Sequence, residues 1–500
     1  MKINYFPGFK SILGRSATRQ GRVTSRFRIN AVKVERTRSS TLEVDLHTQK
    51  DLEIFESDDA SKSLFALCNS TRTEGGAQIL RQRMSNPFSD VTSITRTQQS
   101  ISYIPQNRDL FERLGLWVTG RVERYQRDPL IFVVETSTVG FAMGALTLRM
   151  FDSYHYIRVL RGVQYTCLFV QRMREYLHEL DRDPPKGELA CISEDIRNIV
   201  SLPEFLDVPQ KELRGVSFLK ILRLDQTFRV YSKEKIEELL RLAYELDALV
   251  SMADATHNLG YTIPEVLDGP TRFHATGLVH PQVKNPVPNA AGLDQQRRLL
   301  FLTGPNMAGK TTYLRSVATA LYLGHLGMGV PAASFAFTPV DRLFTSIAIS
   351  DDVHTGTSYF LAEVLRIKSL AFSLSEGQRV VAIMDEPFKG TNVSEALEAS
   401  LAVMQRLESI GNSLFLFSSH LIELEDGFGN SGNIMKCHFE ADETEGKLQF
   451  NYLLQPGVSR QRMGMRVLTE EGVFDLLDKV VSLSDGFDEL ETALTTGLKL

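Results

Sequence analysis

The stretch that constrains this chain most is Gly304–Thr312, which reads GPNMAGKTT. It matches the phosphate-loop pattern of glycine, four residues, glycine, lysine and serine or threonine. The run Arg298–Thr303 before it is of strand type, and Tyr313–Leu326 after it has helical spacing. Strand, glycine loop and helix is the context that this motif needs. The sequence therefore predicts a phosphate-binding site, and the alternative is a strand-to-helix turn that matches by chance.

The residue types of this loop suit a polyphosphate. Gly304 and Gly309 let the backbone bend so that its N–H groups point inward, and the helix that follows adds its positive N-terminal end. Lys310 can reach the β- and γ-phosphates, and the hydroxyl of Thr311 can hold Mg²⁺. These features point to a nucleoside triphosphate.

An acidic pair follows a second apolar run, Arg379–Met384, further along the chain. An all-apolar run suits a buried parallel strand. At its end, Asp385 would hold Mg²⁺ through water or through Thr311, and Glu386 would polarise an attacking water molecule. The alternative is an acidic cap on the strand.

Two more segments carry candidate residues. The strand-like run Ser413–Ser419 ends at His420, a place from which a histidine can sense a γ-phosphate unless its role is structural. Gly356–Phe360 leads into a predicted helix, Leu361–Leu374, and Ser358 suits its N-cap. The sharper interpretation is an anion site at the start of this helix for a phosphate from a second subunit. That interpretation predicts a composite ATPase site in a dimer.

Net charge, apolar runs and cysteine spacing limit the classes of protein to which this chain can belong. The net charge is −5, so any nucleic-acid surface is expected to be a local patch. No apolar run is long enough to span a membrane. The cysteines are far apart, lack zinc spacing and are expected to be reduced thiols of a cytosol-like compartment. They are Cys68, Cys167, Cys191 and Cys437.

The first forty residues carry ten lysines or arginines and one acid, Glu35. Such a segment is typical of an organelle transit peptide. It is equally typical of a flexible basic arm that contacts phosphates, and an incorrectly assigned start is a third alternative. The expected location is therefore cytoplasmic, or mitochondrial or another organelle if the segment is a transit peptide.

The part of the chain before the glycine loop has helical patterns. Ser63–Met84 predicts two helices that are joined or kinked at the pair Gly75-Gly76. Lys233–Leu259 is the clearest amphipathic helix, and its apolar stripe indicates ordinary core packing. We expect the boundary between this helical part and an α/β part near Ile263.

Four motifs, in this order and spacing, resemble the ATPase domain of the MutS DNA mismatch-repair family: GPNMAGKTTYLR, DDVHTGTSYFLAEV, VAIMDEPFKGTNVSEAL and FSSHLIELED. Ser63–Phe88 resembles the start of the helical core of that family, and Glu245–Ala255 resembles its returning lever helix. The resemblance covers Leu42–Val473. It implies an ABC-type P-loop ATPase domain of α/β class at the C-terminus, preceded by an all-α core and lever domain. The expected division is a flexible basic extension at 1–41, a core and lever domain with a reduced or absent clamp at 42–262, the ATPase domain at 263–480 and a tail at 481–500.

The resemblance also implies roles for single residues. Thr311 and Asp385 would serve Mg²⁺, Glu386 would be the base, and His420 would sense the γ-phosphate. Ser358 would reach the nucleotide of a partner subunit. The residues that would bind ATP are Gly304, Pro305, Asn306, Met307, Ala308, Gly309, Lys310, Thr311 and Thr312. The implied partners are mismatched or branched DNA and a second subunit, identical or related, without a membrane.

The chain also departs from the family pattern. Residues 1–41 contain no Phe-x-Glu wedge and are too few for the mismatch-reading and connector domains, and Pro184–Ser232 is too short for a full β-rich clamp. Ala308 replaces a usual glycine, Pro387-Phe388-Lys389 replaces the usual residues after the acidic pair, and Arg462-Met463-Gly464 stands where Ser-Tyr-Gly is usual. We therefore expect an ATPase that switches the engagement of DNA in repair or recombination. The alternatives are an ATP-switched scaffold for protein partners and the ATPase subunit of a transporter.

Overall fold

The N-terminal half of the chain forms helices whose starts are fixed by short polar side chains. In the computed structural model, Asp45, Ser63, Thr73 and Asp90 each accept a backbone N–H of the helix that follows. The structure describes residues 40–57, 62–128, 138–151, 153–209, 216–348, 359–428, 431–444, 447–461 and 464–480. These residues belong to one compact unit. The expected tail, Ser358 and nearly all of the basic extension lie outside the described residues.

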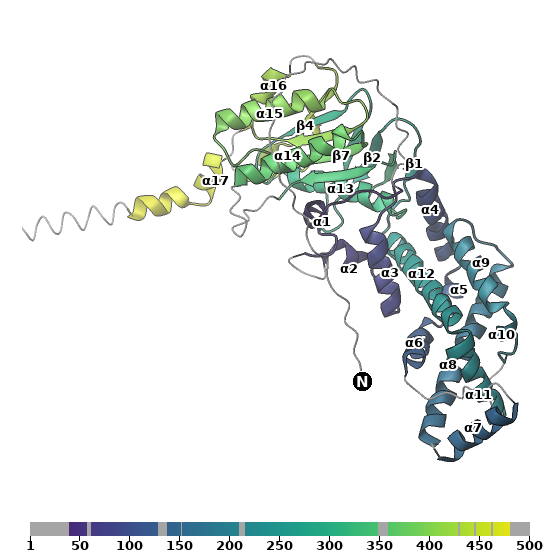
Figure 1. Ribbon diagram of the computed structural model, residues 1–500. Coiled ribbons are helices and arrows are strands. Elements are labelled where there is room, and N and C mark those ends of the chain that lie inside the picture. The colour runs from purple at the N-terminus through teal and green to yellow at the C-terminus, as the bar shows by residue number, and fades with distance from the viewer. Residues whose placement is uncertain are drawn as a thin grey trace, which may run out of the picture. The chain divides into compact units, whose positions relative to one another are not determined.

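The helical part precedes the sheets in the chain (Figure 1). Its helices are α1 (Leu46–Asp51), α2 (Leu64–Cys68), α3 (Glu74–Ser85), α4 (Val91–Gln106), α5 (Arg108–Glu112), η2 (Leu116–Val118), α6 (Thr119–Arg127), α7 (Thr138–Phe151), α8 (Ser153–Leu180), α9 (Glu188–Val200), α10 (Pro203–Leu206), α11 (Phe218–Gln226), η3 (Thr227–Tyr231) and α12 (Lys233–Asn258). The helix predicted over Lys233–Leu259 is confirmed as α12, which packs against α3, α4 and α9.

The predicted joint at Gly75-Gly76 is wrong. Both glycines lie in the first turn of α3, and the break between α2 and α3 comes earlier. The glycines are required by packing, because a Cβ on Gly75 would lie 2.4 Å from the ring of Tyr244 and one on Gly76 would lie 2.2 Å from the carboxylate of Asp247. Asp247 of α12 in turn accepts the backbone N–H groups of residues 72 and 73. The glycines therefore mark close contact between α3 and α12, and not a hinge.

The stretch 184–232, where a clamp would have to be inserted, is helical. Its elements are α9, α10, α11 and η3, and its described residues include no strand. Helix α9 packs against α4, α8 and α12, while α11 packs against α7 and α8. These residues therefore extend the helical part.

The C-terminal part contains a six-stranded sheet in the order β12-β9-β4-β8-β7-β6, a four-stranded sheet in the order β1-β5-β2-β3, and the hairpin β10-β11. Strands β9, β4, β8, β7 and β6 run parallel, and β12 is antiparallel to β9. The strands are β1 (Glu265–Val266), β2 (Phe273–Leu278), β3 (Asn289–Leu293), β4 (Leu299–Thr303), β5 (Ser334–Phe337), β6 (Arg342–Ser346), β7 (Val380–Asp385), β8 (Leu414–Ser418), β9 (Ile434–His438), β10 (Ala441–Thr444), β11 (Lys447–Phe450) and β12 (Gln455–Pro456).

The central strands β4, β8 and β7 are buried on both faces, as their apolar runs predict. Successive residues of a strand point to opposite faces, and the core divides accordingly. Leu300 and Leu302 belong to the cluster that includes α13 (Lys310–His325) and the helical part. Leu299 and Phe301 belong to the cluster with α14 (Tyr359–Ser375) and α15 (Val393–Leu407). Helix α13 therefore covers one face, and α14 and α15 cover the other (Figure 1). Two further short helices are α16 (Leu424–Gly427) and α17 (Gly464–Glu470).

Candidate active site

The glycine loop connects β4 to α13 at the carboxyl edge of the sheet. Gly304 has a φ of 139°, and a Cβ there would lie 2.7 Å from the carbonyl oxygen of Phe439. Gly309 caps α13 with a φ of 101°. Both positions therefore need glycine. Met307, at the exposed tip of the loop, has a φ of 68°, which is unusual for a residue with a side chain.

Lys310 begins α13 and turns its side chain back under the loop. Its Nζ donates to the carbonyl oxygens of Gly304 at 2.7 Å and Pro305 at 3.2 Å. It also lies 3.4 Å from Oε1 of Glu386, and only 5% of its side chain is exposed. The ammonium group is thus held by groups that an incoming phosphate could replace.

Thr311 and Asp385 are in direct contact although they are far apart in the sequence. The Thr311 hydroxyl donates to Oδ2 of Asp385 at 2.5 Å, and the Ser418 hydroxyl donates to Oδ1. Asp385 and Ser418 are register partners at the ends of β7 and β8, and Ser418 is likewise paired with Leu302 near the end of β4. Because parallel strands end at one edge, the topology brings these oxygens together. A hydroxyl and a carboxylate in contact are suitable ligands for Mg²⁺.

Glu386 follows Asp385 with a strained backbone, φ 49°. Its N–H donates to the carbonyl oxygen of Ser418 at 3.1 Å. Its Oε2 lies 2.7 Å from Nζ of Lys389 and 3.7 Å from Nδ1 of His420. The imidazole of His420 and the ammonium groups of Lys389 and Lys310 hold the pKa of Glu386 well below its usual range, although burial acts to raise it. The carboxylate is therefore ionised.

Lys310, Thr311, Asp385, Glu386 and Lys389 line one cavity of about 710 Å³. One wall is the glycine loop with Asp385, Glu386 and Lys389, and the opposite wall is formed by residues between Leu278 and Asn289 together with Tyr452. Asn289 fixes that wall, because its amide nitrogen donates to the Tyr452 carbonyl oxygen at 2.9 Å and its amide oxygen accepts the N–H of Leu454 at 2.7 Å. The cavity has the size of a small-ligand site.

His280 lies on the second wall and is neutral near pH 7. Burial and the charge of Arg315 lower its pKa to about 4, against the opposing charge of Glu53. Val283, Pro286 and Val287 line the same cavity, as does Lys284.

The structure brings most of the sequence-predicted residues together. Lys310, Thr311, Asp385 and Glu386 line the cavity, as do Pro305, Asn306, Met307, Gly309 and Thr312. Gly304 and Ala308 belong to the backbone of the same loop, and Ala308 is buried. His420 is 57% exposed and reaches the site only through Glu386. Ser358 lies outside the described residues, so its predicted role stays a prediction.

Sequence reasoning missed three contributors. The sequence marks Lys389 only as a departure from the family pattern, yet its ammonium lies nearer to the Glu386 carboxylate, at 2.7 Å, than Lys310 or His420 does. Ser418 ends the predicted strand before His420. Its hydroxyl, at the end of a strand next to the one that carries Asp385, is the signal that the sequence offers for a contact with that carboxylate. The wall with His280 and Tyr452 comes from two distant segments, and only the fold shows that they meet.

Comparison with known families agrees with the geometry. Residues 300–483 match the model of MutS domain V, and residues 47–122 match the model of MutS domain III. The first match contains the glycine loop, the acidic pair and His420, and the second contains α1 to α5 with the start of α6. Domain V of this family is an ATPase domain, so the match supports an ATPase that uses ATP and Mg²⁺ at the level of the family. The two matches together cover more than half of the chain, and the chain belongs to the MutS DNA mismatch-repair family.

Proposed function

We propose that this chain binds and hydrolyses ATP in a P-loop, ABC-type site formed by residues 304–312 and the ends of β7 and β8. The observation that carries the proposal is the cavity that unites Lys310, Thr311, Asp385 and Glu386. The loop N–H groups and the N-terminal end of α13 would face the phosphates. Lys310 would exchange its carbonyl partners for β- and γ-phosphate oxygens. Thr311 and Asp385 would hold Mg²⁺, which supplies charge neutralisation when bound.

Glu386 is the proposed base. It is ionised and stands beside the proposed Mg²⁺ ligand Asp385, so it can accept a proton from a water molecule aimed at the terminal phosphate. His420 is the proposed sensor of the γ-phosphate and lies on the open side of the same carboxylate. A phosphate that attracts Lys310 and Lys389 would weaken their hold on Glu386. Its capacity as a base would then increase when the substrate is present.

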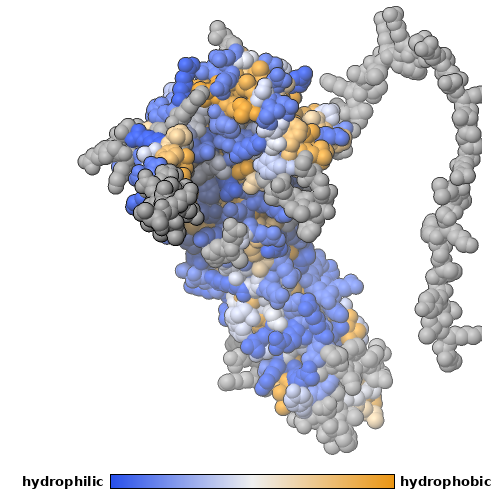
Figure 2. Space-filling model, turned by 90° about the vertical axis from the view of Figure 1, so that its left-hand side faces the viewer, coloured by the Kyte–Doolittle hydropathy of each residue, from blue (hydrophilic) through white to orange (hydrophobic). Residues whose placement is uncertain are grey.

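A dimer is part of the proposal, with Ser358 reaching the nucleotide of a partner subunit that is identical or related. The outer face of α14 supports an interface, because Leu361, Leu365 and Phe372 recur at helical spacing and are 47%, 49% and 67% exposed. Figure 2 shows hydrophobic residues gathered over the α/β part, while the helical part is largely hydrophilic in this view. Exposed apolar groups of this kind fit contacts with another protein.

We further propose that ATP switches the engagement of mismatched or branched DNA by residues 42–262, acting as a core and lever domain with a reduced clamp, while 263–480 act as the ATPase domain. Family membership supports this role. The net charge of −5 and the helical 184–232 stretch favour the second candidate, an ATP-switched scaffold with little DNA contact. The family matches, to MutS domains III and V, do not support the transporter alternative. None of the described helices is long and apolar enough to cross a membrane.

The first test is nucleotide binding and phosphate release by the purified chain. We expect ATP to bind in the presence of Mg²⁺ and phosphate to be released slowly, and EDTA should abolish release. Failure to bind ATP at millimolar concentration with Mg²⁺ would contradict the proposal. Binding without hydrolysis would restrict the chain to a nucleotide-switched role.

A further inference from the structure

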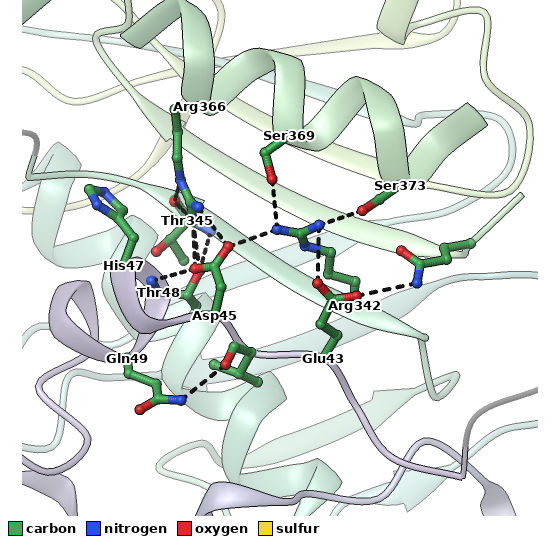
Figure 3. A network of polar contacts seen from close by, with 12 residues as sticks. Glu43, Asp45, His47, Thr48, Gln49, Arg342, Thr345, Arg366, Ser369 and Ser373 are labelled. Atoms are coloured by element: carbon green, nitrogen blue, oxygen red, sulfur yellow. Dashed lines mark hydrogen bonds and ion pairs between the residues drawn. The ribbon is translucent and has the colours of Figure 1, made fainter. Parts of the chain in front are cut away.

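A polar cluster outside the nucleotide cavity joins the α1 segment, residues 45–54, to the six-stranded sheet (Figure 3). Arg366 of α14 donates to both carboxylate oxygens of Asp45, at 2.6 Å and 3.0 Å. Arg342 of β6 reaches the same carboxylate at 2.7 Å. Both guanidinium groups also lie over the ring of Phe344, with centroid distances of 4.0 Å for Arg366 and 5.6 Å for Arg342. Asp45 is therefore the shared counter-ion of two arginines that are 11% and 5% exposed.

Asp51, at the other end of α1, holds the end of strand β6. Its carboxylate accepts the Thr345 hydroxyl at 2.6 Å and the N–H groups of Ile347 and Ala348, both at 3.0 Å. Strand β6 is paired along its length with β7, the strand that ends in Asp385. The α1 segment is thus bonded both to α14 and to the strand beside the acidic pair.

At the start of α14, Glu363 holds the turn that carries the proposed base. Its side chain is 2% exposed, and its two oxygens accept the N–H groups of Lys389 at 3.1 Å and Gly390 at 3.2 Å. The turn is tightly packed, because a Cβ on Gly390 would lie 2.6 Å from the backbone nitrogen of Phe360. It is also strained, since Glu386 and Phe388 both have positive φ values. A strained turn keeps its shape only where the surroundings fix it, and Glu363 supplies two of the fixing bonds.

We propose that Glu363 is a positioning residue for ATP hydrolysis, and that Asp45 acts on the same turn through Arg366 of α14. Glu363 and Arg366 are three residues apart, so they lie on the same side of this 17-residue helix. A change in how α1 docks on Arg366 would move α14, and with it the acceptor that holds the turn of Glu386. The inference rests on the proposed ATPase activity. It states that the position of α1 controls the rate of hydrolysis.

The α1 segment is also hydrogen-bonded to the helical part. A movement of the helical part can therefore be transmitted to α14. The N–H groups of Leu64 and Phe65 donate to the carbonyl oxygens of Glu53 and Ile54 at 2.9 Å and 2.8 Å. After α2, the N–H of Ser70 donates to the Ser251 hydroxyl of α12 at 2.8 Å. Displacement of α12 therefore has a bonded route to α1, α14 and the turn.

The test compares Glu363→Gln, Asp45→Asn and the double variant in the full chain, with Glu398→Gln at an exposed position of α15 as the control. ATP affinity is measured by equilibrium titration, and the chemical step by single-turnover hydrolysis. We expect the ATP dissociation constant of each variant to stay within about threefold of the wild-type value. The hydrolysis rate of Glu363→Gln should fall roughly 10- to 100-fold, because a misplaced catalytic group slows a reaction by about that factor. Asp45→Asn should also slow the chemical step, and the double variant should lose less than the product of the two single effects. Glu398→Gln should match the wild type.

Asp45→Asn removes the carboxylate that pairs with Arg366 and Arg342, and Arg342 keeps its second carboxylate partner, Glu43, at 3.2 Å. Arg366→Lys therefore serves as the variant that keeps the charge but loses the planar fork. It should slow hydrolysis without loss of ATP affinity or of the folded state in thermal unfolding. A wild-type rate for Glu363→Gln, or fully multiplicative effects in the double variant, would overturn this inference alone. An absence of hydrolysis in the wild-type chain would overturn the proposed function and the inference with it.

Discussion

Lys389 and Glu386 form an ion pair, with 2.7 Å between Nζ and Oε2, in the turn that follows β7. The other carboxylate oxygen of Glu386 lies 3.4 Å from Nζ of Lys310. In this arrangement the proposed base is ionised but is held between two cations, which makes it a weak proton acceptor. A polyphosphate would compete for both ammonium groups, so substrate binding and activation of the base would be linked.

Replacing Lys389 by methionine should raise the pKa of Glu386, because loss of a nearby positive charge favours the protonated carboxyl group. The acidic limb of the rate of hydrolysis against pH should then move to higher pH. The measurement is single-turnover hydrolysis across the pH range. Lys284→Met, at another lysine that lines the cavity, is the control and should leave the limb in place. An unchanged limb in Lys389→Met would show that this ion pair does not govern the base.

Lys310→Ala should abolish ATP binding, because the loop loses the buried ammonium group that is placed to meet the β- and γ-phosphates. Equilibrium titration with a fluorescent ATP analogue is the measurement. Lys436→Ala removes a lysine that pairs with Glu425 away from the cavity, and it should bind normally. Wild-type affinity in Lys310→Ala would refute the assignment of the loop.

Glu386→Gln should bind ATP and hydrolyse it far more slowly, since glutamine cannot accept the proton from water. A loss of about 100-fold or more is the size expected of a general base. With hydrolysis blocked, the ATP-bound dimer should accumulate, and size-exclusion chromatography with and without ATP would detect it. Wild-type turnover would remove Glu386 from the base role.

How much of this site the sequence could predict depends on how local each signal is. The glycine loop, the strand before Asp385 and the strand before His420 are continuous motifs, and the structure forms them as β4, β7 and β8 with the expected helix after the loop. The prediction of a joint at Gly75-Gly76 is wrong, because these glycines allow α3 to pack closely against α12 and do not form a turn. The ion pair between Asp45 and Arg366 joins distant segments, so no periodicity or motif marks it.

Asp225→Ala should destabilise the helical part. Its carboxylate forms hydrogen bonds with Arg229 and Tyr125, and the side chains of Asp225 and Arg229 are 1% and 4% exposed. Removing it takes the carboxylate counter-ion away from a buried guanidinium, which costs about 3–5 kcal/mol. The measurement is the free energy of unfolding in urea. Replacing both partners, Asp225→Leu with Arg229→Met, should cost less; an equal or larger loss in the double variant would contradict the account.

His325 should make the unfolding free energy depend on pH. Burial lowers its pKa to about 4 in the folded chain, and the neutral ring accepts the N–H of Val340 while its other nitrogen contacts the carbonyl oxygen of Leu321. Between about pH 6.5 and 4 the unfolded state binds more protons, so stability falls as the pH falls through this window. The slope from this residue approaches about 1.4 kcal/mol per pH unit. His325→Gln should flatten the curve between pH 5 and 6.5, and an unchanged slope would exclude His325 as its source.

The most direct measurement is a DNA-binding titration of the purified chain with homoduplex, mismatched duplex, four-way junction and single-stranded DNA. Each is titrated with ATP, with ADP and without nucleotide, at two salt concentrations. The account predicts an ATP-dependent preference for mismatched or branched DNA, with affinity that falls steeply as salt rises because phosphate contacts release counter-ions. Binding to none of these DNAs, with ATP hydrolysis intact, would contradict DNA engagement and favour the ATP-switched scaffold.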